Sequence, residues 1–149
     1  MSYISQQDLE DELGLDKLIQ LTDDADTGEV GEQRVGKAIS YAQGTFDAYA
    51  RTRYTIPVPV TEKVKATCLD LAVFHLMKSR STVDEGVYKI RKDAHDAAMK
   101  FLQDVQTGRA ALDVPSAEET EEKPASPDSV LRGSAASPEV FSKENLGGY

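Results

Sequence analysis

The chain has 149 residues, and a change of composition after Gly108 limits how much of it can fold. Residues 113–138 contain four prolines and an acidic cluster at residues 118–122, but few large apolar side chains. Such a segment cannot bury enough apolar surface to offset the chain entropy that folding removes. We therefore expect a folded domain at residues 1–108, followed by a flexible tether and a C-terminal docking segment at residues 109–149.

Apolar residues recur at helical spacing before Gly108, and no long alternating strand pattern is present. Ser5 followed by Asp8 predicts a capped helix start, and Gly108 is placed to end the last helix. The expected helices cover residues 6–13, 16–21, 32–51, 61–79 and 84–107. The sequence thus predicts an all-α fold, a small bundle of three to five helices with an extended tail that a partner orders.

Two of these helices carry further information about packing. The helix at residues 61–79 is apolar nearly all the way round, which predicts that other helices or a neighbouring subunit enclose it. Gly36 and Gly44 lower the helix propensity of residues 32–51 by up to about 1 kcal/mol each, and they could mark close helix contacts. The inner side of the last helix is expected to hold Val87, Ile90, Ala94, Ala97, Ala98, Phe101, Leu102 and Val105.

The net charge of −9 is unevenly distributed along the chain. Residues 1–32 carry −9, residues 33–108 carry +4, and the remainder carries −4. This pattern suits contact between copies or with a foreign partner, whereas a free nucleic-acid binder is more often basic overall. The lone Cys68 excludes an internal disulfide and favours a reducing compartment. No segment is typical of a bilayer span or a signal peptide, so no membrane association is expected.

The candidate catalytic and metal-ligating residues do not form a known pattern. The acids of residues 23–29 fit no register of the calcium-loop template, so a solvated turn is expected there. Cys68 and His75 are two ligand types on one helix, too few for a zinc site. His95 lies beside Asp93 and Asp96 on an expected exposed face, without any nucleophile motif. We predict no catalytic residue, no cofactor and no metal.

Asp70 is a carboxylate within the apolar run of residues 61–79, and burial of an unpaired charge is costly. We expect it to pair with Arg51 or Arg53, or to accept a hydrogen bond from a tyrosine. Pro57 and Pro59 predict an extended connector at residues 55–60, because proline lacks a donor and biases the preceding residue away from helix.

The candidate binding residues lie in the proline connector and at the C-terminus. In the terminal segment, apolar anchors follow the tether, which is typical of a segment that folds as it binds. The predicted partner-binding residues are Arg53, Tyr54, Pro57, Pro59, Phe141, Leu146 and Tyr149.

Several short motifs together resemble the Mu-like phage and prophage head-tail adaptor proteins. They are Tyr3-Ile4-Ser5, Leu21-Thr22-Asp23, Ala38-Ile39, Arg53-Tyr54-Thr55-Ile56-Pro57, Asp70-Leu71-Ala72 and Val140-Phe141-Ser142. The resemblance implies a helical subunit that forms a ring in the virion neck, with the twelve-fold symmetry of the portal. During assembly the subunit is expected in the host cytoplasm. Its implied neighbours are the portal protein and a tail terminator or other neck protein, with DNA passing through the lumen without specific binding. The resemblance implies no enzymatic role.

A different class of function fits the same residues. A small helical regulatory protein could bind a partner through its tail, or bind DNA through the basic residues 33–108. A ring-forming subunit is expected to reach high-order species with its portal, whereas a regulator is expected to stay monomeric or dimeric.

Overall fold

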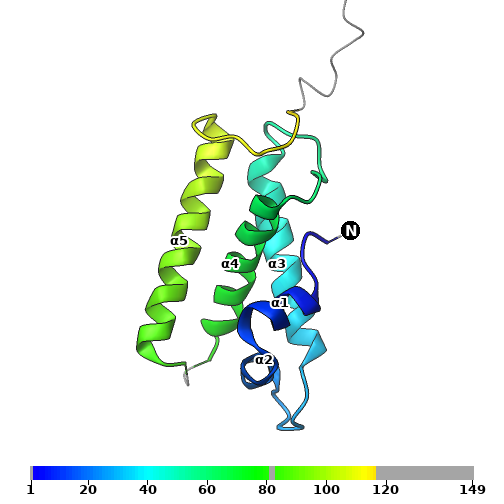
Figure 1. Ribbon diagram of the computed structural model, residues 1–149, viewed down its shortest axis with the longest axis vertical. Helices are drawn as coiled ribbons and strands as arrows, with labels where there is room; N and C mark the ends of the chain where they lie inside the picture. Colours follow the sequence, from blue (N-terminus) through cyan, green and yellow to red (C-terminus); the bar gives the residue numbers. More distant parts are fainter. Residues whose placement is uncertain (1, 81–82, 117–149) are drawn as a thin grey trace, which may run out of the picture. The chain divides into compact units, whose positions relative to one another are not determined.

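The computed structural model describes residues 2–80 and 83–116, which form five α-helices and no β-strand (Figure 1). The helices are α1 (Gln6–Leu13), α2 (Leu15–Thr22), α3 (Glu32–Ala50), α4 (Glu62–Met77) and α5 (Glu85–Thr107). Each lies at a position that the sequence predicts, so the all-α bundle is confirmed.

Side-chain caps mark the start of α1, α4 and α5, and a glycine marks the end of α5. At α1, the Asp8 carboxylate accepts from the Ser5 N–H at 2.8 Å, and Ser5 Oγ accepts from the Asp8 N–H at 3.3 Å. Thr61 caps α4 and Asp84 caps α5 in the same manner, through the backbone N–H groups of the first turn. Gly108 ends α5 with a φ of +89°, a left-handed conformation that favours glycine.

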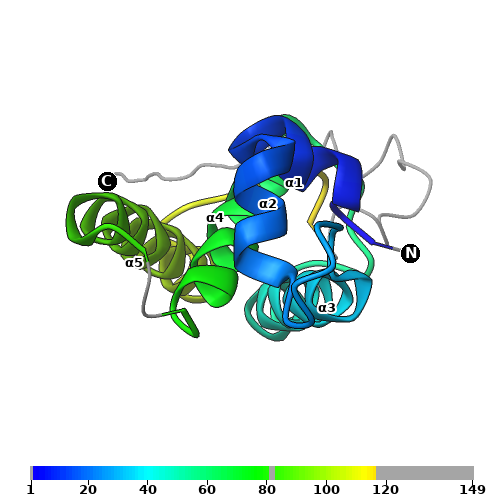
Figure 2. The ribbon, with the colours of Figure 1, turned by 90° about the horizontal axis from the view of Figure 1, so that it is seen from below.

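The three long helices α3, α4 and α5 pack against one another, and α1 and α2 pack on one side of this group (Figures 1 and 2). Helix α4 contacts each of the other four helices. Its buried residues accordingly point in most directions around its axis: Val64, Thr67, Cys68, Leu71, Ala72, Val73, Leu76 and Met77. Of the two alternatives that the sequence leaves open for this helix, enclosure by other helices of the same chain is the one observed.

Tyr3 joins the N-terminal segment to the core and to the proline connector. Its ring packs edge-on against Phe46 at a centroid distance of 5.1 Å. Its hydroxyl donates to the Asp47 carboxylate at 2.6 Å and accepts from the Val58 N–H at 3.2 Å. Burial raises the pKa of this hydroxyl, and the hydrogen bond to Asp47 raises it further, so the group stays protonated.

The glycines of α3 do not have the role that the sequence suggests. A Cβ at Gly36 or Gly44 would meet no atom within 4 Å, and both glycines are exposed, so the expected close contacts within the chain are absent. The close approach occurs instead at Gly31, before the helix. Its N–H donates to Thr22 Oγ1 at 2.9 Å, and a Cβ there would overlap the Thr22 carbonyl. Only glycine fits this junction between α2 and α3.

Replacing Phe46 by Ala is expected to lower the free energy of unfolding by about 3–5 kcal/mol, because this fully buried ring would leave a cavity at the core. Chemical denaturation measures the change. Ile90→Ala is the matched control. Since the Ile90 side chain is 68% exposed, its truncation is expected to change stability by no more than about 0.5 kcal/mol. Similar losses for both variants would contradict the assignment of the core.

Candidate interaction surface

Helix α5 exposes apolar residues that the sequence places on its inner side. Ile90 is 68% exposed, Val87 is 37% exposed, and Ala97 is also exposed. Only Ala98, Leu102 and Val105 of the expected inner residues are buried. The expectation is therefore wrong for Val87, Ile90 and Ala97. Periodicity shows that residues share one side of a helix, but not whether another element of the same chain covers that side.

We call this surface the α5 stripe and define it by Val87, Ile90, Ala94, Ala97 and Phe101. The spacing alternates between three and four residues, as in the contact seam of a packed helix pair. With a rise of 1.5 Å per residue, the stripe is about 21 Å long. Ala94 and Phe101 are partly buried, and the Lys63 ammonium lies 4.4 Å from the centre of the Phe101 ring. The stripe thus combines partly buried side chains at Ala94 and Phe101 with exposed ones at Val87, Ile90 and Ala97.

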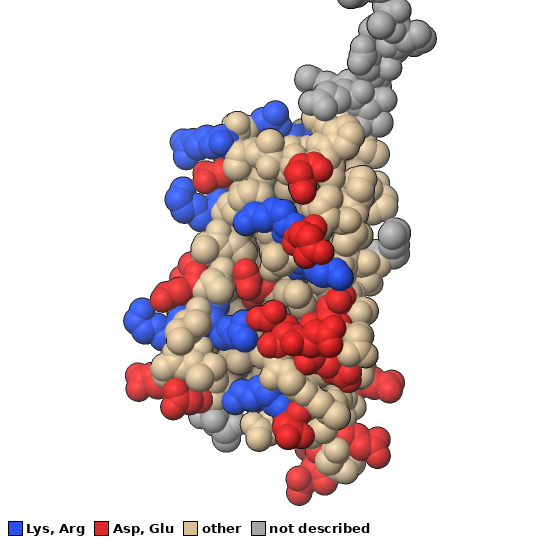
Figure 3. Space-filling model, in the orientation of Figure 1, with Lys and Arg blue, Asp and Glu red and all other residues tan. Residues whose placement is uncertain are grey.

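The charged residues of α5 largely neutralise one another. Three lysine and aspartate pairs lie one helical turn apart: Lys89 with Asp93, Lys92 with Asp96, and Lys100 with Asp104. Exposed pairs of this kind add little to stability. In Figure 3, acidic side chains gather over α1 and the end that holds α2, whereas both signs alternate along α5. The charges on α5 are therefore mixed in sign, whereas those over α1 and the end that holds α2 are mainly acidic (Figure 3).

Asp70 faces α1 and α5, which corrects its expected pairing with Arg51 or Arg53. The charges that act on it belong to Glu12, Arg91, Lys63 and His95. Arg91 forms a salt bridge with Glu12 at 3.0 Å, which links α5 to α1. Burial raises the pKa of Asp70 and Glu12 raises it further, while Arg91 and Lys63 act in the opposite direction. Arg51 and Arg53 follow the end of α3, where the Arg53 guanidinium lies against Gly108. The expected hydrogen bond from a tyrosine is also absent among the described residues.

Replacing Asp70 by Asn is expected to raise the free energy of unfolding at neutral pH. The folded pKa of Asp70 is raised, so its ionisation destabilises the fold as pH rises through the interval between the unfolded and folded pKa values. The gain should disappear below the unfolded pKa of about 4, where the native carboxyl is protonated. Denaturation curves at acidic and neutral pH measure the difference.

Asp24→Asn provides a control with the opposite sign. The Arg34 guanidinium holds the pKa of Asp24 below its usual value through a hydrogen bond of 2.7 Å. Its stabilising effect is therefore present at neutral pH and is lost as pH falls through the folded pKa. Asp24→Asn should lower stability at neutral pH. A gain from Asp24→Asn, or a loss from Asp70→Asn, would contradict these electrostatic assignments.

The candidate binding residues at positions 53–59 occupy different environments. Tyr54 is buried, and its hydroxyl accepts from the Leu112 N–H at 2.9 Å, so its side chain contributes to the fold. Arg53 is exposed, with its guanidinium against Gly108. Pro57 and Pro59 are exposed on the connector. A partner could thus reach Arg53 and the prolines, and partner binding by these residues stays a prediction. Phe141, Leu146 and Tyr149 lie outside the described residues.

The two histidines pack against aromatic rings. His75 stacks on Tyr41 at a centroid distance of 4.5 Å, and burial lowers its pKa. His95 is also largely covered, which corrects the expected exposed position: it packs on Phe74 at 4.6 Å and lies 3.2 Å from Asp96. The side of α5 that carries His95 is the side that meets α4.

The remaining candidates for chemistry are also structural. Burial raises the pKa of the Cys68 thiol to about 12, which suppresses the reactive thiolate. Asp23 accepts from the Thr27 and Gly28 N–H groups, so its carboxylate shapes the acidic loop. Among the described residues, no group of three or more His, Cys, Asp or Glu side chains is placed to hold a metal ion. No described helix has the length and apolar character of a membrane span.

Residues 3–130 match the family model described as bacteriophage Mu, Gp36. The match makes this chain a protein of Mu-like phages. Since it extends over well more than half of the sequence, the chain belongs to the bacteriophage Mu Gp36 family. No curated protein matches the chain.

Proposed function

We propose that this protein is a structural subunit of the phage neck, a head-tail connector that assembles into a ring between the portal and the tail. The ring joins the portal on one side to a tail terminator or other neck protein on the other, and DNA passes through its lumen without specific binding. The subunit assembles in the host cytoplasm and remains in the virion. The proposal includes no catalytic step and no cofactor.

The observation that carries this proposal is the exposed α5 stripe on a small bundle of a phage family. Val87, Ile90 and Ala97 are exposed in one row, and contiguous exposed apolar surface marks protein interaction sites, whereas single exposed apolar residues need no explanation. The chemistry of the described residues points in the same direction, because the histidines and the cysteine pack within the fold. A subunit with these properties acts through contacts with other proteins.

Co-expression with the cognate portal protein tests the proposal. We expect the two proteins to co-purify, and light scattering should give a mass that corresponds to a ring of subunits on a portal. The protein should also be present in purified virions. A chain that stays monomeric or dimeric with its portal, and is absent from virions, would contradict the proposal. Retention on DNA at moderate salt without the portal would favour the DNA-binding alternative.

A further inference from the structure

We propose that the α5 stripe is the docking site for the C-terminal segment, residues 139–149, of the neighbouring copy in the ring. This inference rests on the proposed connector function and names the partner of one surface of that connector. The occupant is thus a segment of the same sequence, supplied by a second copy of the protein, and it lies outside the described residues.

The first support comes from where the described chain ends. After α5, the Leu112 N–H donates to the Tyr54 hydroxyl at 2.9 Å, and Asp113 accepts from Thr61 Oγ1 at 2.8 Å. Tyr54 follows α3 and Thr61 precedes α4, so residues 109–116 carry the chain from the end of α5 toward α3 (Figure 1). Both partners flank the segment that joins α3 to α4. The described chain therefore ends beside this connector and not along the α5 stripe.

The second support is the length of chain available. Residues 117–138 are 22 residues that join Ser116 to the terminal segment. A chain of that length can extend to at most about 3.3–3.6 Å per residue, and its full extension is several times the diameter of about 10–12 Å of one helix. In a ring of side-by-side subunits, the departing chain can reach an adjacent α5 without being fully extended.

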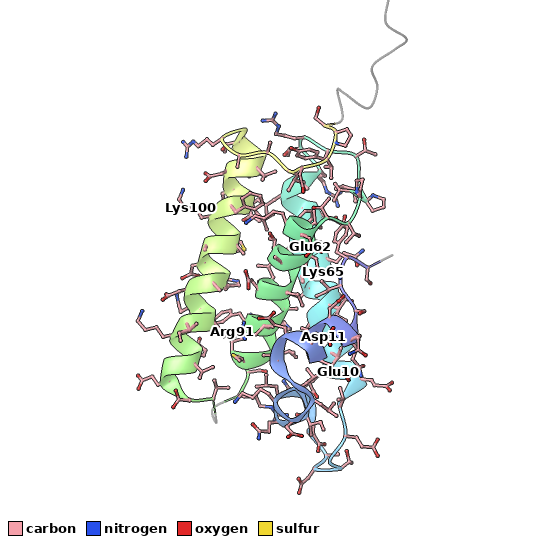
Figure 4. The ribbon with its side chains drawn as sticks, viewed as in Figure 1. Glu10, Asp11, Glu62, Lys65, Arg91 and Lys100 are labelled. Atoms are coloured by element: carbon pink, nitrogen blue, oxygen red, sulfur yellow. The ribbon has the colours of Figure 1, made fainter. Side chains whose placement is uncertain are left out.

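The third support is chemical complementarity. The terminal segment contains Phe141 and Leu146, with Lys143 between them. The stripe offers apolar side chains, and the salt bridge between Arg91 and Glu12 holds α1 next to this part of α5. Figure 4 shows Glu10 and Asp11 on α1 on the same face as Arg91. Apolar anchors on the stripe, with the lysine toward the exposed Asp11 and the partly exposed Glu10, would satisfy both partners.

Cysteine cross-linking in the full chain, co-expressed with the portal, tests the docking. The variant carries Ile90→Cys and Leu146→Cys, and a short bismaleimide is the probe. Native Cys68 can remain because it is fully buried. We expect a ladder of covalent multimers. The matched control pairs Gln103→Cys with Leu146→Cys, because Gln103 is exposed on a different side of α5, and this pair should give no ladder.

The other outcomes are equally specific. Dimers from Ile90→Cys alone would show that two α5 stripes meet, and would overturn the inference. A cross-link within single chains would show that the segment folds back on its own subunit, which also overturns it. Portal-bound rings without any cross-link would overturn the docking and leave the connector function standing. A ladder from a protein that does not bind the portal would support the docking and contradict the proposed connector.

Discussion

Deletion of residues 139–149 is expected to abolish stable incorporation into the neck while leaving the melting temperature nearly unchanged. The bundle described in residues 2–80 and 83–116 has its core without this segment. Burial of two or three large apolar side chains supplies roughly 1.5–3 kcal/mol each before the cost of ordering the segment. That amount holds a free monomer weakly, but it becomes large when it is repeated around a closed ring. Thermal melts and the protein content of purified particles measure the two effects.

A matched pair of variants separates the anchors from the length of the segment. The triple variant Phe141→Ala, Leu146→Ala and Tyr149→Ala should reproduce the deletion, because it removes the apolar contacts. Ser142→Ala with Asn145→Ala should incorporate normally, because it leaves those anchors in place. Normal numbers of infectious particles from the deleted protein would show that the segment is not a docking element.

The helices of this protein were predictable because their ends are determined by local chemistry. Ser5 and Asp8 satisfy the first N–H groups of α1, and Gly108 supplies the left-handed residue after α5. The extended connector at residues 55–60 was predictable for a similar reason, because Pro57 and Pro59 act on their own backbone and on the residue before them. The sequence of α4 is apolar nearly all the way round, which predicted that other elements enclose this helix. The other four helices do contact it.

The contacts between helices, and the side chains that these contacts bring together, were not predictable from the same sequence patterns. The expected partners of Asp70 were Arg51, Arg53 or a tyrosine hydroxyl, but its surroundings are set by the way α1 and α5 pack on α4. Nothing local in the sequence specifies that packing. Gly36 and Gly44 likewise mark no close contact within the described chain, because low helix propensity does not show which side of a helix faces a neighbour.

The α5 stripe illustrates how a functional surface can resemble a core. Val87 and Ile90 repeat at the spacing of Leu102 and Val105, yet only the second pair is buried. The neighbouring alanines do not separate the two pairs either, because Ala94 and Ala97 accompany the exposed pair and the buried Ala98 accompanies the other.

Ile90→Asp is expected to prevent incorporation into portal-bound rings without unfolding the subunit. The side chain is 68% exposed, so the stability change should remain within about 0.5–1 kcal/mol. A carboxylate in the centre of the stripe would have to be desolvated without a partner when the terminal segment docks. Gln103→Asp adds the same charge at an exposed position of α5 outside the stripe, and it should assemble normally. Co-purification with the portal, alongside denaturation curves, compares the two.

Combining Ile90→Asp with the deletion of residues 139–149 shows whether the two changes act on one contact. If the terminal segment binds the stripe, either change alone removes the whole contact, and the combination should weaken assembly no further. Quantifying residual co-purification in the two single variants and the double variant gives this comparison. Losses that multiply would mean that the stripe and the segment bind different partners in the neck. In that case the stripe would still be an assembly surface, but its occupant would be another protein.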